Sequence, residues 1–170
     1  MTHTQLFIMS LTSPKKLGAV RFMPIGKVLQ YAFLLITLLT VFSFARFTTG
    51  VADSTLDMSG LMEYVEDIRF LLYPVAFILL FIVNTLLMFA RISLYALAGT
   101  LFMHTMKRRG EYRNVWRTAT FAITWATLLT MVFEFVPLPT LVSTSIAIFI
   151  TMLFIIIGLT KYPQLPPATK

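Results

Sequence analysis

The sequence predicts an all-α integral membrane protein with four transmembrane helices and with both termini in the cytoplasm. Three observations support this class: 58% of the 170 residues are hydrophobic, 12% are charged, and the mean hydropathy is +0.83. Soluble domains carry about 25% charged residues, whereas helices that cross a ~30 Å hydrocarbon core need ~20 apolar residues. The chain contains no cysteine, which excludes disulfides and thiolate metal sites.

Hydropathy divides the chain into three parts. We expect residues 1–27 to form a basic segment at the cytoplasmic membrane surface, residues 28–160 a four-helix membrane domain, and residues 161–170 a cytoplasmic tail. The expected spans cover about residues 28–47, a stretch within 70–106, residues 118–136 and residues 141–160. A cleaved signal peptide is disfavoured, because the cationic region before the first span is long and the apolar run has full length.

The N-terminal segment begins with an amphipathic stretch and continues into a cationic one. We expect Leu6, Phe7, Met9 and Leu11 to enter the lipid headgroups, and Pro14 to turn the chain. The cations that follow are Lys15, Lys16, Arg21 and Lys27. We interpret them first as a topology anchor, with a lipid or partner contact as the alternative.

A second cationic cluster lies between spans two and three, in KRRGEYRNVWR. It contains Lys107, Arg108, Arg109, Arg113 and Arg117, together with Trp116. With four spans, both clusters lie on one side of the membrane, which the excess of Lys and Arg in cytoplasmic loops identifies as the cytoplasm. Anionic lipid headgroups are therefore expected partners. Nucleic acid is not, because the same cations are needed beside the membrane.

The region between spans one and two is expected on the outer side. Residues 48–59 are rich in Gly, Asp, Ser and Thr, which predicts a loop. A short outer amphipathic helix follows, with Leu61, Val65, Ile68 and Leu72 at helical spacing, and leads into span two near Pro74.

The second span is longer than one crossing requires. Its 37 residues measure about 55 Å as one helix. One version is a long tilted helix with Arg91 near the middle of the membrane. The other crosses over residues 70–90, places Arg91 at the cytoplasmic boundary, and lays the rest along the inner surface. Burying an Arg costs at least ~2.5 kcal/mol, which favours either the second version or a long helix whose Arg faces other helices.

Several polar residues fall within the spans. Arg113, Arg117, Thr120, Thr124, Thr127, Met131 and Glu134 share one helix face. We interpret this stripe as a helix-packing seam, with a polar transport path as the alternative. At the outer end we predict a contact between Arg46 and Glu134, as a structural clamp rather than a substrate site. Asn84, Met88, Arg91 and Tyr95 share a face of span two, for which we expect a packing role, with a small buried polar network as the alternative.

Signatures of catalysis are missing from the sequence. It has no glycine-rich phosphate loop, no HExxH and no GxSxG, and its two histidines, His3 and His104, are far apart. We therefore expect no enzyme activity, no catalytic residue, no cofactor and no metal.

Two stretches carry a family resemblance. SPKKLGAVRF with IGKVLQYAFLL, and ISLYALAGTLF with RRGEYRNVWRTATFAITWATLL, resemble an uncharacterised bacterial family of integral membrane proteins found mainly in Firmicutes and grouped loosely with Yip-type proteins. The first stretch matches through Ser13, Pro14, Lys15, Arg21, Phe22, Gly26 and Lys27, with the Arg–Phe order reversed. Typical members carry a larger extracytoplasmic insert between spans one and two. Some are described as maltodextrin-utilisation membrane proteins, so the resemblance implies a bacterial plasma membrane and a link to sugar uptake.

Three functional hypotheses follow. The first is a non-enzymatic accessory or scaffold subunit of a larger membrane complex, or a homo-oligomer, in association with a transporter. The second is a small transporter or channel that uses the stripe of Thr120, Thr124, Thr127 and Glu134. The third is a protein that organises anionic lipids through its cytoplasmic cations.

Overall fold

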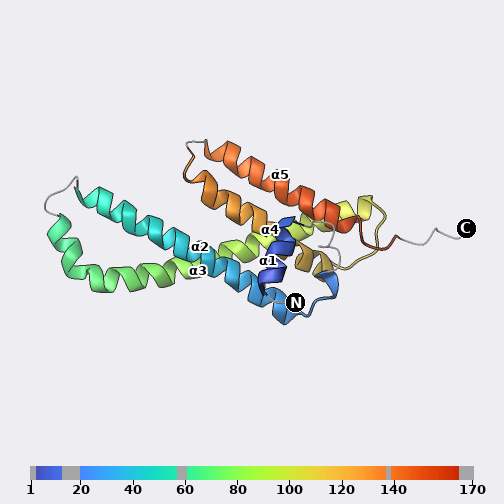
Figure 1. Ribbon diagram of the computed structural model, residues 1–170, viewed down its shortest axis with the longest axis horizontal. Coiled ribbons are helices and arrows are strands. Elements are labelled where there is room, and N and C mark those ends of the chain that lie inside the picture. The colour runs from blue at the N-terminus through green and yellow to red at the C-terminus, as the bar shows by residue number, and fades with distance from the viewer. Residues whose placement is uncertain (1–2, 13–19, 57–60, 137–138, 165–170) are drawn as a thin grey trace, which may run out of the picture. The chain divides into compact units, whose positions relative to one another are not determined.

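The computed structural model describes residues 3–12, 20–56, 61–136 and 139–164. Within these residues the protein is all-helical (Figure 1). Its helices are α1 (His3–Thr12), α2 (Ile25–Leu56), α3 (Leu61–Thr105), α4 (Tyr112–Phe133) and α5 (Thr140–Leu159). Three stretches are long and apolar enough to cross a membrane, namely Ile25–Gly50, Phe70–Thr105 and Thr140–Leu159. The all-helical class predicted from the sequence is therefore confirmed for the described residues, and three helices have the length and composition of membrane spans.

The chain forms two compact units. One consists of Phe33–Met88, and the other of Met1–Ala32 together with Phe89–Lys170. We call the first the hairpin unit. We call the second the four-segment unit, because it consists of α1, the start of α2, the end of α3 and the α4–α5 pair.

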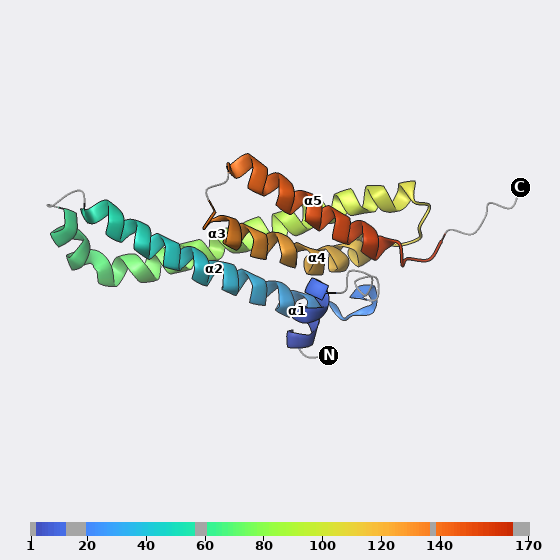
Figure 2. The same cartoon turned by 45° about the horizontal axis from the view of Figure 1, so that its top comes forward.

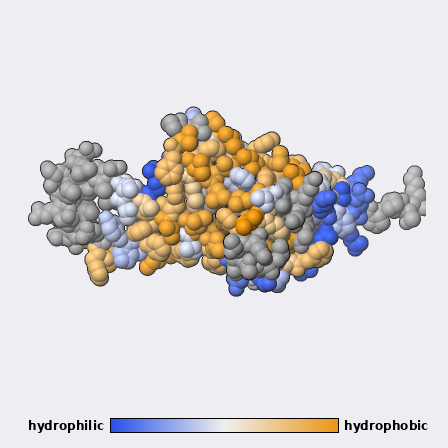
Figure 3. All heavy atoms as spheres, viewed as in Figure 1, coloured by the Kyte–Doolittle hydropathy of each residue, from blue (hydrophilic) through white to orange (hydrophobic). Residues whose placement is uncertain are grey.

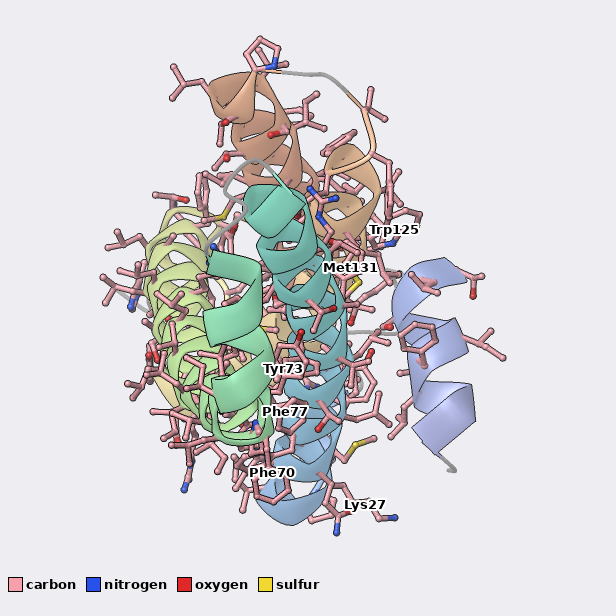
Figure 4. The ribbon with its side chains drawn as sticks, turned by 90° about the vertical axis from the view of Figure 1, so that its left-hand side faces the viewer. Lys27, Phe70, Tyr73, Phe77, Trp125 and Met131 are labelled. Atoms are coloured by element: carbon pink, nitrogen blue, oxygen red, sulfur yellow. The ribbon has the colours of Figure 1, made fainter. Side chains whose placement is uncertain are left out.

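The hairpin unit pairs α2 with the first part of α3. Asn84 donates a hydrogen bond to the hydroxyl of Thr40 at 3.2 Å. Phe44 meets the edges of Tyr73 and Phe77, with ring centroids 6.2 and 5.3 Å apart. Figure 4 shows Tyr73 and Phe77 on the side of α3 that faces α2. These perpendicular ring contacts, a favoured aromatic geometry, hold α3 against α2 at this level.

The loop predicted at residues 48–59 is wrong over most of its length, because α2 continues to Leu56. The hydroxyl of Thr48 donates to the carbonyl of Ala45, and that of Thr49 to the carbonyl of Arg46. Such bonds back to the preceding turn keep a threonine compatible with a helix. Gly50 adds no steric conflict, since a Cβ there would meet nothing within 4 Å. Residues 57–59 of the predicted loop lie outside the described residues.

Helix α3 is continuous over 45 residues and contains Pro74. The predicted outer helix and the second span are thus one helix, whose N-terminal part bends (Figure 1); a proline removes one backbone hydrogen bond and bends the helix around it. The helix also runs through Arg91 without a break. Its course agrees with the single-helix version of span two, and the depth of Arg91 in a membrane stays a prediction.

In the four-segment unit, α4 and α5 lie side by side and antiparallel (Figures 1 and 2). Helix α4 is the most enclosed element, with ten buried residues, four of them threonines. These threonines lower its hydropathy, which explains why α4 is not among the three candidate spans although its 22 residues measure about 33 Å. Helix α3 comes close at Gly99, where a Cβ would lie 2.8 Å from Val115 and 3.0 Å from Ile155.

Helix α1 packs on α4 rather than standing apart from the bundle. Leu6 and Ser10 are fully enclosed, and the indole of Trp125 donates to the carbonyl of Leu11 at 3.2 Å. Figure 4 shows Trp125 on the side of α4 toward α1. The expectation that Leu6 enters the headgroups is therefore wrong, because its apolar side chain is buried against protein.

Candidate anion-binding site

Three segments far apart in the sequence meet at one end of the four-segment unit. Arg117 donates from Nη1 to the carbonyl of Arg21 at 2.6 Å. Arg108 donates from Nη1 to the carbonyl of Tyr162 at 2.7 Å, and the backbone N–H of Arg109 donates to Pro163 at 2.8 Å. We call this region, formed by residues 20–22, 107–117 and 161–164, the basic end. Hydrophilic side chains gather over the α3–α4 connection in Figure 3.

The end of α3 shapes this region. The N–H of Lys107 bonds the carbonyl of His104, the N–H of Arg108 bonds that of Met103, and Lys107 has a φ of 51°. This is the hydrogen-bond pattern of a Schellman motif, with a lysine in the left-handed position that glycine usually occupies. The motif turns the chain sharply, and Arg108 then forms an antiparallel bridge with Gln164. The C-terminal segment is thereby held against the α3–α4 connection.

A pocket of about 740 Å³ lies at the basic end. Its wall contains four arginines, an amide and a phenol ring, contributed by Arg21, Arg109, Arg113, Arg117, Asn114 and Tyr162. The N-terminus of α4 also borders it, and the residue that precedes the helix, Glu111, makes no side-chain cap. The positive end of the helix dipole therefore adds to the guanidinium charges.

The arginines of the pocket differ in their partners. Arg113 pairs with Glu111 at 2.6 Å, but both side chains are more than 60% exposed, so the pair contributes at most ~1 kcal/mol. In contrast, the Nε atoms of Arg21 and Arg117 are buried and have no hydrogen-bond partner in the described part of the chain. Two arginines whose Nε atoms lack a partner thus line a strongly positive pocket.

Aromatic rings hold Arg21 in place. Its guanidinium lies 4.4 Å from the ring centroid of Phe22 and 5.0 Å from that of Tyr162. The Tyr162 side chain is 1% exposed, and its hydroxyl shares a 3.0 Å hydrogen bond with Thr118. Burial raises the pKa of Tyr162, and the bond to Thr118 and the charges of Arg21 and Arg117 oppose this only in part. The phenol therefore stays neutral at physiological pH.

Only part of the predicted basic cluster lines the pocket. Lys107 is exposed at the end of α3, and Lys27 is exposed at the start of α2 and points outward in Figure 4. Trp116 stacks on Phe89 with centroids 6.2 Å apart. Lys15 and Lys16 lie outside the described residues.

Six lining residues were not among the predicted site residues: Phe22, Gly110, Glu111, Asn114, Tyr162 and Pro163. The one available signal for Tyr162 was its position in Lys-Tyr-Pro directly after an apolar helix, where a turn back toward the bundle is possible. Asn114 carries no pattern that distinguishes it from neighbouring surface residues, and Phe22 was noted only as part of the family resemblance.

The threonine stripe of α4 is enclosed rather than open. Thr120 and Thr127 are buried and donate to the carbonyls four residues before them. Thr124 donates to the carbonyl of Phe121 and also bonds the hydroxyl of Tyr31 at 2.7 Å. The Tyr31 hydroxyl lies 2.9 Å from that of Ser10 on α1. These contacts have the form of a packing seam that joins three helices.

The remaining intramembrane candidates do not form one network. Arg91 is exposed, Asn84 bonds Thr40, and Tyr95 bonds Thr151 on α5. Because Arg91 is exposed, it is not part of a buried polar network, and the packing role expected for this face stays a prediction. Arg46 and Glu134 belong to different units, so their contact stays a prediction.

Sequence comparison gives one match. A family model described as "Protein of unknown function (DUF1189)" matches residues 43–159, which is more than half of the chain. The later of the two stretches that carried the resemblance lies inside this region, and the N-terminal one lies outside it. No curated protein and no solved structure matches significantly.

Proposed function

The chain belongs to the DUF1189 family of proteins of unknown function, and on this premise we propose that it is a non-enzymatic accessory or scaffold subunit of a bacterial plasma-membrane complex. One observation carries the proposal. The Phe70–Thr105 stretch has a mean hydropathy of 2.4, and none of its most apolar window is buried by the rest of the chain. Leaving a large apolar side chain in water forfeits ~1.5–3 kcal/mol. Lipid and a partner helix are the surroundings that cover such a surface, and the family resemblance suggests a sugar transporter as the partner.

We propose four crossings with both termini in the cytoplasm. The proposal is supported by the antiparallel pairing of α4 with α5, because a helix that lies along a spanning partner of similar length crosses with it. It is also supported by the meeting of three cationic segments at one end of a single unit, as the positive-inside rule requires for the cytoplasmic side.

A transport path along α4 has less support. Each hydroxyl of Thr120, Thr124 and Thr127 already has a backbone acceptor and lies in a packed interior. A solute or ion on this path would have to displace both the neighbouring helices and these bonds.

The absence of cysteine from the sequence makes topology directly testable. Single cysteines are placed at Lys161 and Thr140, both exposed and at opposite ends of α5. A membrane-impermeant maleimide applied to intact spheroplasts should label Thr140→Cys at once and Lys161→Cys only after lysis. Equal labelling of both, or the reverse pattern, would overturn the four-span proposal.

The accessory role is tested by site-specific photo-crosslinking in intact membranes. A photoreactive residue at Leu86, which is 66% exposed on α3, should give one protein adduct of defined mass. The same group at Leu153 on α5, 42% exposed, is the control and should not give that adduct. A chain that forms no adduct from α3 and purifies as a monomer in mild detergent contradicts the proposal.

A second proposed role is the organisation of anionic lipid at the basic end. It is supported by the gathering of arginines from three segments at this end. In nanodiscs of mixed phosphatidylglycerol and phosphatidylcholine, the protein should enrich phosphatidylglycerol around it, and the enrichment should fall as salt is raised. Equal amounts of both lipids around the protein at low salt would refute this role.

A further inference from the structure

We propose that the arginine-lined pocket is a specific site for one phosphate group, presented as a phosphate monoester or diester. This proposal deepens the proposed role in organising anionic lipid. It rests on that role only where a lipid headgroup is the source of the phosphate. It names a single saturable site with its own residues, whereas the lipid role requires only a basic surface.

The first argument is uncompensated charge. Arg117 is pinned against the backbone of Arg21 by a 2.6 Å bond, which holds two guanidinium groups in one pocket wall. The single carboxylate in the described lining, Glu111, is bonded to Arg113 instead. Like charges held together are unfavourable, so an anion between Arg21 and Arg117 would stabilise the arrangement.

The second argument is the set of donors that lack an acceptor. The buried Nε atoms of Arg21 and Arg117 each carry a hydrogen with no acceptor in the described residues. A buried donor without a partner is costly, and guanidinium groups match phosphate oxygens in paired geometry. Two arginine edges, together with the N-terminus of α4, offer a phosphate the donors it uses elsewhere in proteins.

The third argument is that the wall is preorganised. Tyr162 is fixed by its hydroxyl on Thr118 and by its carbonyl on Arg108, and its ring supports Arg21. Phe22, which is 76% exposed, also contacts this guanidinium with its ring. Because Arg21 rests on the fixed ring of Tyr162, less of its conformational freedom remains to be lost when a ligand binds.

Size and position agree with a phosphorylated ligand. A volume of about 740 Å³ lies within the usual range of small-molecule sites. Tyr162 follows directly after α5, whose 20 residues measure about 30 Å. If α5 crosses the bilayer, the pocket lies at the level of the headgroups, where lipid phosphates are. A soluble phosphate ester on the cytoplasmic side is the other source of the same chemistry.

The test is binding to the full chain purified in mild detergent and stripped of lipid. Native mass spectrometry measures adducts of dioctanoyl phosphatidylglycerol and of dioctanoyl phosphatidylcholine, and calorimetry measures inorganic phosphate and pyrophosphate. We expect one saturable site. Arg21→Gln should weaken binding by about 10-fold or more, as the loss of a charged hydrogen bond does.

Matched variants separate a site from general charge. Lys161→Gln removes the same charge from the same end but lies outside the pocket lining, so binding should change less than about twofold. Arg117→Lys keeps the charge but loses the planar fork, so it should also weaken binding. Arg21→Gln preserves the backbone carbonyl that Arg117 uses, and its thermal unfolding should remain close to that of the wild type.

The outcomes are distinct. The site binds lipid if the wild type forms a phosphatidylglycerol adduct that Arg21→Gln loses and free phosphate does not bind. It binds a soluble ester if phosphate or pyrophosphate binds and no lipid adduct forms. Equal binding by Arg21→Gln and the wild type, or equal losses in Arg21→Gln and Lys161→Gln, overturns the site. Salt-sensitive enrichment of phosphatidylglycerol that persists in Arg21→Gln nanodiscs would leave the lipid role standing while the pocket proposal fails.

Discussion

Replacing Gly99 by alanine tests the packing of α3 against α4 and α5. A Cβ at this position would lie 2.8 Å from Val115 Cγ1 and 3.0 Å from Ile155 Cγ2, and both side chains are 0% exposed. β-branched side chains are stiff at χ1, so the backbone has to move. Overpacking costs ~1–3 kcal/mol, and alanine recovers ~1 kcal/mol of helix propensity. Because both neighbouring side chains are stiff and fully buried, we take the upper part of the overpacking range, about 2–3 kcal/mol, and expect a net loss of about 1–2 kcal/mol.

The matched control is Gly26→Ala, in the same unit, where a Cβ would meet nothing within 4 Å. Unfolding by sodium dodecyl sulfate in mixed micelles is followed by tryptophan fluorescence, since both tryptophans lie on α4. Gly26→Ala should be neutral or stabilising, whereas Gly99→Ala should unfold at a lower denaturant fraction. Adding Val115→Ala to Gly99→Ala should restore part of the loss. A Gly99→Ala chain as stable as the wild type would show that the helices do not approach as closely as described.

Three further variants use the same unfolding measurement. Tyr31→Phe keeps the ring stacked on α4 but removes a buried hydroxyl that bonds two other helices. It should lower the free energy of unfolding by ~0.5–1.5 kcal/mol. An unchanged unfolding midpoint would contradict these hydrogen bonds. Lys107→Gly should raise the free energy of unfolding by ~0.5–1 kcal/mol. The left-handed backbone at Lys107 costs an L-residue ~1–2 kcal/mol, and the greater entropy of glycine in the unfolded chain offsets part of the relief. A destabilised variant would argue against the Schellman motif. The pKa of Tyr162 is raised in the folded state, so as pH rises this tyrosine loses its proton first in the unfolded chain. The free energy of unfolding should therefore fall as pH rises above 10.0, until the folded-state pKa is passed. Tyr162→Phe should flatten this part of the pH profile, and identical profiles would refute the role of burial.

Hydropathy predicted the helices because the apolar surface of a membrane-type protein faces outward. The stretches Phe70–Thr105 and Thr140–Leu159 agree with the predicted spans to within a few residues for this reason. Helix α4 is an exception, because its threonines are buried in the protein interior and lower the mean hydropathy by which a span is identified. Its face periodicity nevertheless predicted the packing seam, because residues four apart on a helix share a face.

The pocket was only half predictable. The charge pattern placed the cations of residues 107–117 and Arg21 on one side of the membrane, and Arg117 indeed lies against Arg21. Which cations line a cavity depends on contacts between residues 54 and 96 positions apart, such as those of Arg108 and Arg117. Neither periodicity nor composition contains that information. The residue at which α3 ends was also hard to predict from the sequence, because the left-handed position is occupied by lysine rather than glycine.

The docking of α1 and Tyr31 on α4 has a consequence for biogenesis. The partner of the Tyr31 hydroxyl, Thr124, lies 93 residues later in the chain, and Trp125 bonds a carbonyl 114 residues before it. At roughly 5–20 residues per second, the ribosome delivers α4 roughly 5–20 seconds after Tyr31. During this interval the polar hydroxyl of Tyr31 on α2 lacks its final partner. The helix made first is therefore among the last to reach its native contacts, and the interval before α4 arrives is when the nascent chain is most exposed to misassembly and proteolysis.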